Sequence, residues 1–288
     1  MFKKILGIVL VVVLAAVGLA GCGNNEDDDA KKTVKLAYVS WLDTVAITHL
    51  AAAVLEDKMG YEVELTLADI APVLASVANG STDAYLEVWL PYTHKSYMDK
   101  YGDDMVDLGV IYEGARCGLV VPSYVDINSI EELNENKELF DGVITGIDPG
   151  AGIMESSAQT IEEYNLDYAV QSGSETTMTA ALSKAINNNE PIVVTGWAPH
   201  WKFARWDLKF LEDPKLTFGE SEICYKYSRM GLEEDMPEVV EFIKNFRLTA
   251  EDVAEMMEAL EEDAEDPKAV ARDWMNAHEE LVNSWLPE

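Results

Sequence analysis

Short apolar runs alternate with segments of helical spacing along most of the chain. Residues 34–39 form an apolar run, and residues 44–58 place Ala46, Leu50 and Val54 on one face of a helix. Strands that alternate with helices in this way predict parallel sheets that are covered by helices. Further strands are predicted at residues 61–67, 84–88, 119–122, 143–147, 192–195 and 223–227, and further helices at 71–78, 129–139, 152–164 and 176–187.

The strand–helix series occurs twice, and the chain then becomes wholly helical. Extended segments near residues 119–125 and 223–228 join the two series, which predicts two lobes with a cleft between them. We expect lobe 1 at residues 33–122, lobe 2 at 123–226, and C-terminal helices that return to lobe 1 at 227–288. The predicted C-terminal helices are residues 237–246, 249–263 and 267–285.

Residues 1–21 have the pattern of an export signal. Two lysines precede an apolar run at residues 8–17, which is short for a membrane span. Residues 19–22, Leu-Ala-Gly-Cys, resemble the bacterial lipoprotein signal, in which Cys22 is acylated and becomes the new N-terminus. The resemblance implies a protein held by lipid on the extracellular face of the cell membrane, and a transmembrane helix is the alternative. Residues 22–32 are then an acidic tether.

The chain is strongly acidic, with a formal net charge of −32 over 288 residues. Loss of the two lysines of the signal makes the mature protein two charges more negative. This charge repels phosphates and so argues against nucleic acid as a partner. It suits a protein that stays soluble at high ionic strength, where charge is screened.

Two cysteines remain once Cys22 is assigned to acylation. Cys117 and Cys224 lie far apart in the sequence. Outside the cell such a pair can oxidise to a disulfide, but two buried free thiols are equally ordinary. Both alternatives stay open on the sequence alone.

Three tryptophans share one structural position. Trp41, Trp89 and Trp197 each stand at the end of a short apolar strand. In open α/β sheets the carboxyl ends of the strands face the ligand crevice. Because tryptophan offers the best aromatic face to a cation, three indoles around one point predict a cage for a quaternary ammonium group, with ordinary core packing as the alternative. Packing is the role expected of the other four: Trp201, Trp206, Trp274 and Trp285.

A glycine-rich turn provides a complementary anion site. Residues 146–153, Gly-Ile-Asp-Pro-Gly-Ala-Gly-Ile, run from a predicted strand into a predicted helix. Glycines let the backbone approach a ligand, and the free N–H groups at a helix start bind anions. A plain structural turn is the alternative. A phosphate cradle is disfavoured, because no Gly-Lys-Ser/Thr ending follows.

Together these residues resemble the glycine betaine-binding proteins of ABC transporters. The matching stretches are residues 36–41, 88–95, 146–154 and 194–201, and the second and fourth are the most distinctive. The resemblance covers essentially the whole mature chain. It implies an α/β fold of the two-lobe periplasmic-binding-protein type, a type II Venus flytrap, with parallel-rich sheets flanked by helices and a hinge between the lobes.

The resemblance also assigns roles to single residues. The three tryptophans match the cage that holds the trimethylammonium group. His94 matches the histidine that binds the ligand carboxylate, and the backbone N–H groups of Gly152 and Ile153 match the other carboxylate donors. His200 is expected to orient Trp197, and no cofactor or metal is expected.

The function implied is that of an extracellular receptor of an ABC importer. It captures glycine betaine or a related quaternary ammonium osmoprotectant, closes around it, and delivers it to permease subunits in the membrane. Two alternatives stand beside it: an extracellular enzyme that acts on a betaine-like solute, and a receptor that serves a sensor kinase. The sequence has neither a Gly-x-Ser-x-Gly nor a His-Glu-x-x-His motif, which disfavours an enzyme.

Overall fold

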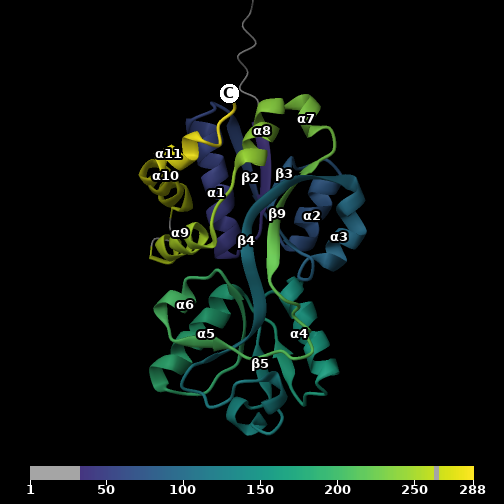
Figure 1. Ribbon diagram of the computed structural model, residues 1–288, viewed down its shortest axis with the longest axis vertical. Helices are drawn as coiled ribbons and strands as arrows, with labels where there is room; N and C mark the ends of the chain where they lie inside the picture. The colour runs from purple at the N-terminus through teal and green to yellow at the C-terminus, as the bar shows by residue number, and fades with distance from the viewer. Residues whose placement is uncertain (1–32, 263–265) are drawn as a thin grey trace, which may run out of the picture. The chain divides into compact units, whose positions relative to one another are not determined.

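The computed structural model describes residues 33–262 and 266–288 (Figure 1). The strands pair in the order β2-β1-β3-β9-β4-β7-β5-β6, with β8 on β4. Their bounds are β1 Thr33–Tyr38, β2 Glu62–Leu67, β3 Ala84–Leu90, β4 Met105–Pro122, β5 Val143–Thr145, β6 Ala169–Gln171, β7 Val194–Ala198, β8 Leu208–Phe210 and β9 Glu222–Arg229.

Helices cover the sheets on both sides, and short 3-10 turns fill some connections. The α-helices are α1 Leu42–Asp57, α2 Ile70–Ala78, α3 Lys95–Tyr101, α4 Gly152–Glu163, α5 Glu175–Asn188, α6 Lys202–Arg205, α7 Leu232–Asp235, α8 Pro237–Asn245, α9 Ala250–Glu262, α10 Pro267–Ala277 and α11 Glu279–Asn283. The 3-10 turns are η1 Gly102–Asp104, η2 Ile130–Glu132 and η3 Lys137–Phe140.

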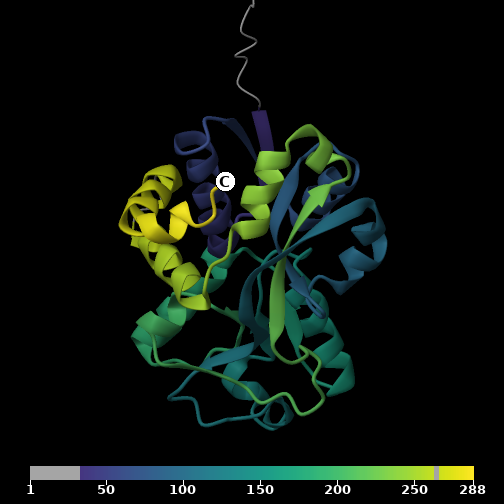
Figure 2. The same cartoon turned by 45° about the horizontal axis from the view of Figure 1, so that its top comes forward.

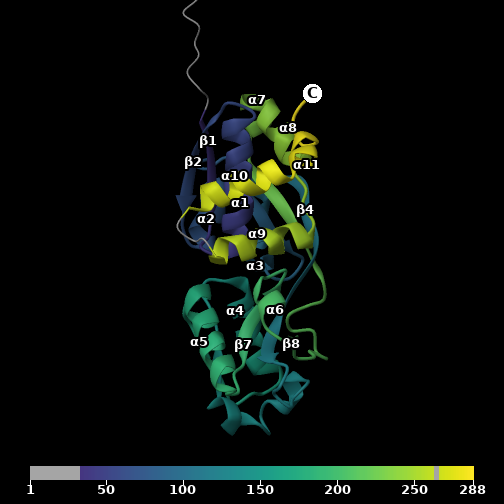
Figure 3. The same ribbon diagram turned by 90° about the vertical axis from the view of Figure 1, so that its left-hand side faces the viewer.

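The first lobe is built on strands β2, β1, β3 and β9 and the first half of β4. Strand β1 runs parallel to β2 and β3, whereas β9 runs antiparallel to β3 and β4. Helices α9 and α10 pack against α1, as Figure 3 shows from the side. The C-terminal helices therefore return to the lobe that contains β1 and α1.

Helix α1 is buried along most of its length inside this lobe. Twelve of its residues are buried, from Asp43 to Leu55. The helix is apolar nearly all round, as expected of one that is covered on every side. Its N-terminus, which carries Trp41 and Asp43, therefore has a well-fixed position.

The second lobe is built on β7, β5, β6, β8 and the second half of β4. Strand β5 is parallel to β6 and β7, and β4 is antiparallel to β7 and β8. Helices α4 and α5 begin at the carboxyl ends of β5 and β6. Both helices thus present their N-termini to the same edge of the sheet.

Strand β4 belongs to both lobes, and Figure 2 shows it running from one to the other. Its residues 105–115 pair with β9, and its residues 116–122 pair with β7 and β8. We therefore propose lobe bounds that differ slightly from the predicted ones. Lobe 1 is residues 33–115 with 222–288, and lobe 2 is residues 116–221.

The predicted helix at 129–139 is wrong. Two 3-10 turns stand in its place, η2 and η3, although the predicted capping box between Ser129 and Glu132 is present. The side-chain amide of Asn136 donates to the carbonyl of Glu132 at 2.9 Å. Asparagine competes with the backbone in this way, which disfavours a continuous helix. The predicted helix at 267–285 is likewise divided, at His278.

Cys117 and Cys224 are free and buried, so the disulfide is not formed. Across residues 33–262 and 266–288, no helix has the length and apolar character needed to cross a membrane. The predicted signal, the tether and the acylated Cys22 lie outside the described residues.

Candidate functional site

All six residues predicted to contact a ligand line one cavity. It has an empty volume of about 320 Å³, part of it open to solvent, and both lobes contribute to its wall. The predicted residues in the wall are Trp41, Trp89, His94, Gly152, Ile153 and Trp197. The wall also contains Asp43, Thr93, Cys117, Ile147 and Ala151, none of which was predicted individually to contact the ligand.

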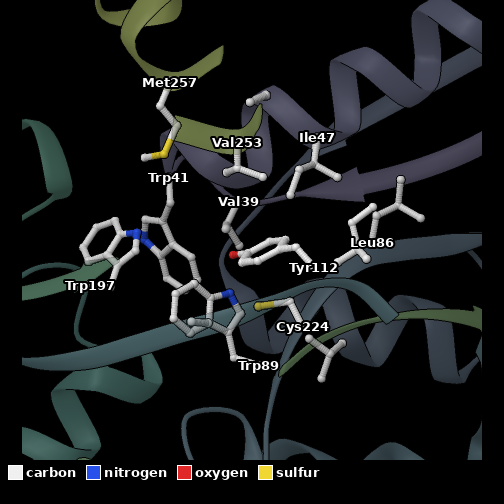
Figure 4. Close-up of a cluster of buried hydrophobic side chains, with 14 of the residues drawn as sticks. Val39, Trp41, Ile47, Leu86, Trp89, Tyr112, Trp197, Cys224, Val253 and Met257 are labelled. Atoms are coloured by element: carbon white, nitrogen blue, oxygen red, sulfur yellow. The ribbon is translucent and has the colours of Figure 1, made fainter. Parts of the chain in front are cut away.

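The three indoles reach the cavity from strand ends in both lobes, and Figure 4 shows them pointing toward one another. Trp41 lies between β1 and α1, Trp89 lies near the end of β3, and Trp197 lies near the end of β7. Each is buried, with at most 9 % of its surface exposed. Their neighbours in the sheets are the two thiols: Cys224 stands opposite Trp89, and Cys117 opposite Trp197.

Each indole is held in place by a polar or aromatic neighbour. Trp41 Nε1 donates to Asp148 Oδ2 at 3.0 Å, a bond that joins the two lobes. The ring of Trp89 meets Tyr112 edge to face at 6.3 Å between centroids. The ring of Trp197 meets His200 in the same manner at 4.8 Å. Because the three rings are already immobilised, little side-chain conformational entropy is lost when a ligand binds between them.

His94 directs an unpaired N–H toward the cavity. Its Nδ1 accepts the backbone N–H of Trp89 at 2.9 Å, so the ring proton resides on Nε2. Nε2 is buried and has no partner among the described residues. Burial lowers the pKa of His94 to about 3, so the ring is neutral at ordinary pH. A neutral N–H in this position can donate to an anion without bringing a charge.

The start of α4 adds two further donors. The N-cap residue Ala151 has no side chain that could accept a hydrogen bond. In the described part of the chain, the backbone N–H groups of Gly152 and Ile153 make no hydrogen bond. Unpaired N–H groups at a helix start, reinforced by the helix dipole, form an anion site.

At Gly152 the backbones of the two lobes approach each other closely. A Cβ atom on this glycine would lie 1.9 Å from the carbonyl oxygen of Thr93, in the loop after β3. Side chains do not tolerate such a distance, and the obstacle is backbone. Glycine is therefore required here for the observed approach of the lobes.

Asp43 brings a carboxyl group into the cavity wall. It is 2 % exposed, and its Oδ1 accepts the N–H of Thr44 at 2.9 Å. Burial raises the pKa of Asp43 to about 6, and the hydrogen bond from Thr44 opposes the shift. The sequence does offer a signal for this residue, since an aspartate two positions after Trp41 lies in the first turn of a largely apolar helix.

Behind Trp197 lies a buried set of ionisable groups that sequence analysis missed. Lys202 Nζ stands 4.3 Å from the centroid of the Trp197 ring and makes no hydrogen bond among the described residues. Burial lowers the pKa of Lys202 to about 7, while the charge of Glu175 opposes this shift. Burial also raises the pKa of Glu175 to about 8. Lys202 does not line the cavity, so it acts on the rear face of the indole.

The remaining histidines lie away from the cavity. His49 and His278 contact carbonyls of their own helices, at Val45 and Trp274. One group of potential metal ligands occurs in the described residues: Asp252, Glu255 and His278 offer atoms within 4.8 Å of one another. Asp252 already accepts from Thr249 at the start of α9, so we assign it to helix capping.

Comparison with known proteins agrees with this geometry. Residues 32–277 match the family model described as the substrate-binding domain of ABC-type glycine betaine transport systems. A curated relative, the glycine betaine/carnitine transport binding protein GbuC of Listeria monocytogenes, is 39% identical over 179 residues, or 61% of this chain. The chain spans 57% of the length of that relative.

Two solved structures share the fold across nearly all of their length. The glycine betaine/L-proline-binding protein ProX from Borrelia burgdorferi is 35% identical with a TM-score of 0.87, over 89% of this chain and 97% of that one. Lactococcal OpuAC in its closed-liganded conformation with glycine betaine is 37% identical with a TM-score of 0.84, over 89% and 100%. The α/β periplasmic-binding-protein fold is thereby confirmed, and the chain belongs to the family of substrate-binding domains of ABC-type glycine betaine transport systems.

Proposed function

We propose that this protein is the receptor of an ABC importer and that it captures glycine betaine or a close quaternary ammonium analogue. One observation carries the proposal. Three indole faces line the cavity between the two lobes together with the N–H donors of His94, Gly152 and Ile153, which the other described residues leave unpaired. The two kinds of group suit the two ends of a zwitterion that carries an onium at one end and a carboxylate at the other.

The indoles are suited to the onium end. A trimethylammonium group has no N–H, so hydrogen-bond acceptors gain little from it. Aromatic faces attract it through the ring quadrupole, at about 0.5–2 kcal/mol for each contact. Trp41 and Trp89 from one lobe and Trp197 from the other would enclose it, while Asp43 supplies a negative charge nearby.

His94, Gly152 and Ile153 are suited to the carboxylate end. All three offer N–H groups that other described residues leave unpaired. An unpaired buried donor costs about 1–3 kcal/mol, so a carboxylate that accepts from these groups removes that cost. His94 comes from lobe 1 and the two amides from lobe 2, so the carboxylate, like the onium, would bridge the lobes and favour closure.

The thiol in the described cavity wall is unsuited to nucleophilic catalysis, which favours a receptor over a cysteine-dependent enzyme. The nucleophile candidate in its wall is the thiol of Cys117, and burial raises its pKa far above the usual range. A thiol in that state is inert. The contacts of its Sγ include Thr93 Oγ1 at 3.4 Å, and no base activates it in the described wall.

Delivery and anchoring complete the proposal. The relatives are named as binding proteins of transporters, which supports permease subunits in the membrane as the partner. Acylation at Cys22 would keep the receptor on the extracellular face, and residues 22–32 would let it reach the permease. A receptor for a sensor kinase shares the same site, and co-purification with a permease separates the two.

Replacement of Trp197 by alanine tests the cage. We expect the dissociation constant for glycine betaine to rise by about tenfold or more, because a cation–π contact and its buried area are both lost. Isothermal titration calorimetry measures the change. Trp201→Ala is the matched control, since Trp201 is equally buried but does not line the cavity. Equal loss of affinity in both variants would show that the effect is general unfolding, and the cage at Trp197 would then be wrong.

The affinity for glycine betaine is also expected to fall in acid. The onium favours ionised Asp43, so binding lowers a pKa that burial has raised to about 6, and it releases a proton below that pH. Affinity should therefore be constant above about pH 7 and decrease below about pH 6, by at most tenfold per pH unit. Asp43→Asn should flatten this profile in calorimetry. A wild-type slope that persists in the variant would assign the titration to another group.

A further inference from the structure

The first helix of lobe 1 satisfies the N–H of Thr44 with its own Asp43, but its N-cap residue cannot satisfy the N–H of Leu42. Its N-cap residue is Trp41, whose side chain carries no hydrogen-bond acceptor. The first N–H groups of a helix have no partner inside the helix and need one from outside. The N–H of Leu42 finds it in the other lobe, because it donates to Glu175 Oε2 at 3.0 Å. The missing cap is thus supplied across the cleft.

Glu175 is free to serve the opposite lobe, because its own helix is capped by another residue. It opens α5, where Ser174 and Thr177 form a capping box. Its second oxygen, Oε1, lies 3.0 Å from His200 Nε2. His200 Nδ1 accepts the N–H of Lys202 at 3.2 Å, so the ring proton is on Nε2 and is donated to Glu175. Both carboxyl oxygens are therefore acceptors with defined directions.

Some groups around the Glu175 carboxyl group favour its negative charge, and others oppose it. It lies between the N-termini of α1 and α5, whose helix dipoles favour negative charge. Lys202 attracts it, while Asp43 and Asp148 repel it. The side chain is 5 % exposed, so opening of the lobes would return it to water and leave Leu42 uncapped.

We propose that Glu175 is an inter-lobe latch, a positioning residue that caps helix α1 only when the lobes are closed and so holds Trp41 in the cage. This rests on the proposed function. Trp41 is adjacent to the capped residue, and its own indole bonds to Asp148 of lobe 2. Closure and formation of the cage thus depend on the same few atoms. The latch itself does not line the cavity.

Two readouts test the latch, one without ligand and one with it. Asp103→Cys and Glu138→Cys place dyes on exposed positions in lobe 1 and lobe 2, in a protein that also carries Cys22→Ala. Cys117 and Cys224, the native cysteines of the described residues, are buried. Energy transfer between the dyes then measures the closed population of the ligand-free protein. Stopped-flow tryptophan fluorescence measures the off-rate of glycine betaine. Each is compared in the unmodified protein, Glu175→Ala, Glu175→Gln and the control Glu155→Ala.

We expect Glu175→Ala to lower the closed population and to raise the off-rate about tenfold or more, because the two hydrogen bonds that the Glu175 carboxyl group accepts, from Leu42 and His200, are lost. Glu175→Gln keeps one acceptor oxygen and should lose less. Glu155 also bridges the lobes, at 2.9 Å to Ser96 Oγ, but on the surface, so Glu155→Ala should stay within about twofold of the unmodified protein.

The outcomes separate the two proposals. If Glu175→Ala gives the same energy transfer as the labelled protein that keeps Glu175, the latch is contradicted, whether or not the protein binds betaine. Lower energy transfer that Glu155→Ala does not share supports it. If the unmodified protein gives no change in tryptophan fluorescence with betaine, the proposed function is contradicted instead. The energy transfer between the dyes, measured without ligand, still tests the latch. If Glu175→Ala fails to fold, Glu175→Gln carries the same comparison.

Discussion

A Gly152→Ala substitution is expected to abolish measurable binding of glycine betaine while the ligand-free protein stays folded. The added Cβ would lie 1.9 Å from the carbonyl oxygen of Thr93, and that obstacle is backbone of the opposite lobe. The lobes would have to stay apart, so the onium and carboxylate contacts could not form together. We expect the dissociation constant in calorimetry to rise about a hundredfold or more, which corresponds to about 2.7 kcal/mol.

The ligand-free protein should tolerate this change, because Gly152 has no left-handed backbone and opens helix α4. Alanine has the higher helix propensity, so the melting temperature should not fall. Gly150→Ala is the matched control two residues earlier, since its Cβ would meet only Tyr97 Oη, at an ordinary 3.7 Å. Tight betaine binding by Gly152→Ala would mean that the ligand is held without the observed approach of the lobes.

The cavity wall could be predicted because its residues follow from position along the chain. Trp89 and Trp197 stand at carboxyl ends of strands, and that position alone directs them to the crevice. The register of His94 five residues after Trp89 matched the family pattern, and the structure connects the two by a hydrogen bond. Local sequence and the family resemblance together therefore locate six residues of the cavity wall, but not Asp43 or Thr93.

Apart from the contact between His200 and Trp197, the contacts behind that layer could not be predicted, because they join distant residues. Glu175 and Leu42 are 133 positions apart, and neither has a local pattern that indicates the other. Lys202 looks like an ordinary surface lysine until the fold places its Nζ beneath an indole. The sequence does contain one indication that α1 needs a partner. Trp41 is a poor N-cap residue, so a helix that begins after it needs a hydrogen-bond acceptor from elsewhere.

Strand β4 was largely missed for a different physical reason. Its pairing with β9 shifts register three times, near Asp107, near Tyr112 and near Ala115. Gly109 and Gly114 take positive φ angles at these irregularities. Each bulge reverses the faces to which side chains point, so the alternation that marks a strand is interrupted. Only its last residues, 119–122, keep an uninterrupted apolar run, and only these were predicted as a strand.

The second large effect expected concerns stability rather than binding, at a lysine in β9. Lys226 is fully buried, and its ammonium group donates to three backbone carbonyls at the end of α8: Ile243 at 2.7 Å, Lys244 at 3.2 Å and Phe246 at 2.6 Å. An ammonium has three N–H donors, and the last carbonyls of a helix have no partner inside it. Lys226 thus satisfies the end of a helix that packs against the strand shared by both lobes.

Lys226→Met is therefore expected to lower the free energy of unfolding by about 3 kcal/mol, because a side chain of similar length leaves buried carbonyls unpaired. Urea denaturation followed by circular dichroism measures the loss. Lys244→Met is the control at the same helix end, since Lys244 is half-exposed, pairs with Glu233 at 2.8 Å, and should change stability by less than about 0.5 kcal/mol. If Lys226→Met were as stable as the unmodified protein, the desolvation free energy of the ammonium group would equal the free energy gained from its three hydrogen bonds. Lys226 would then not stabilise the α8 terminus.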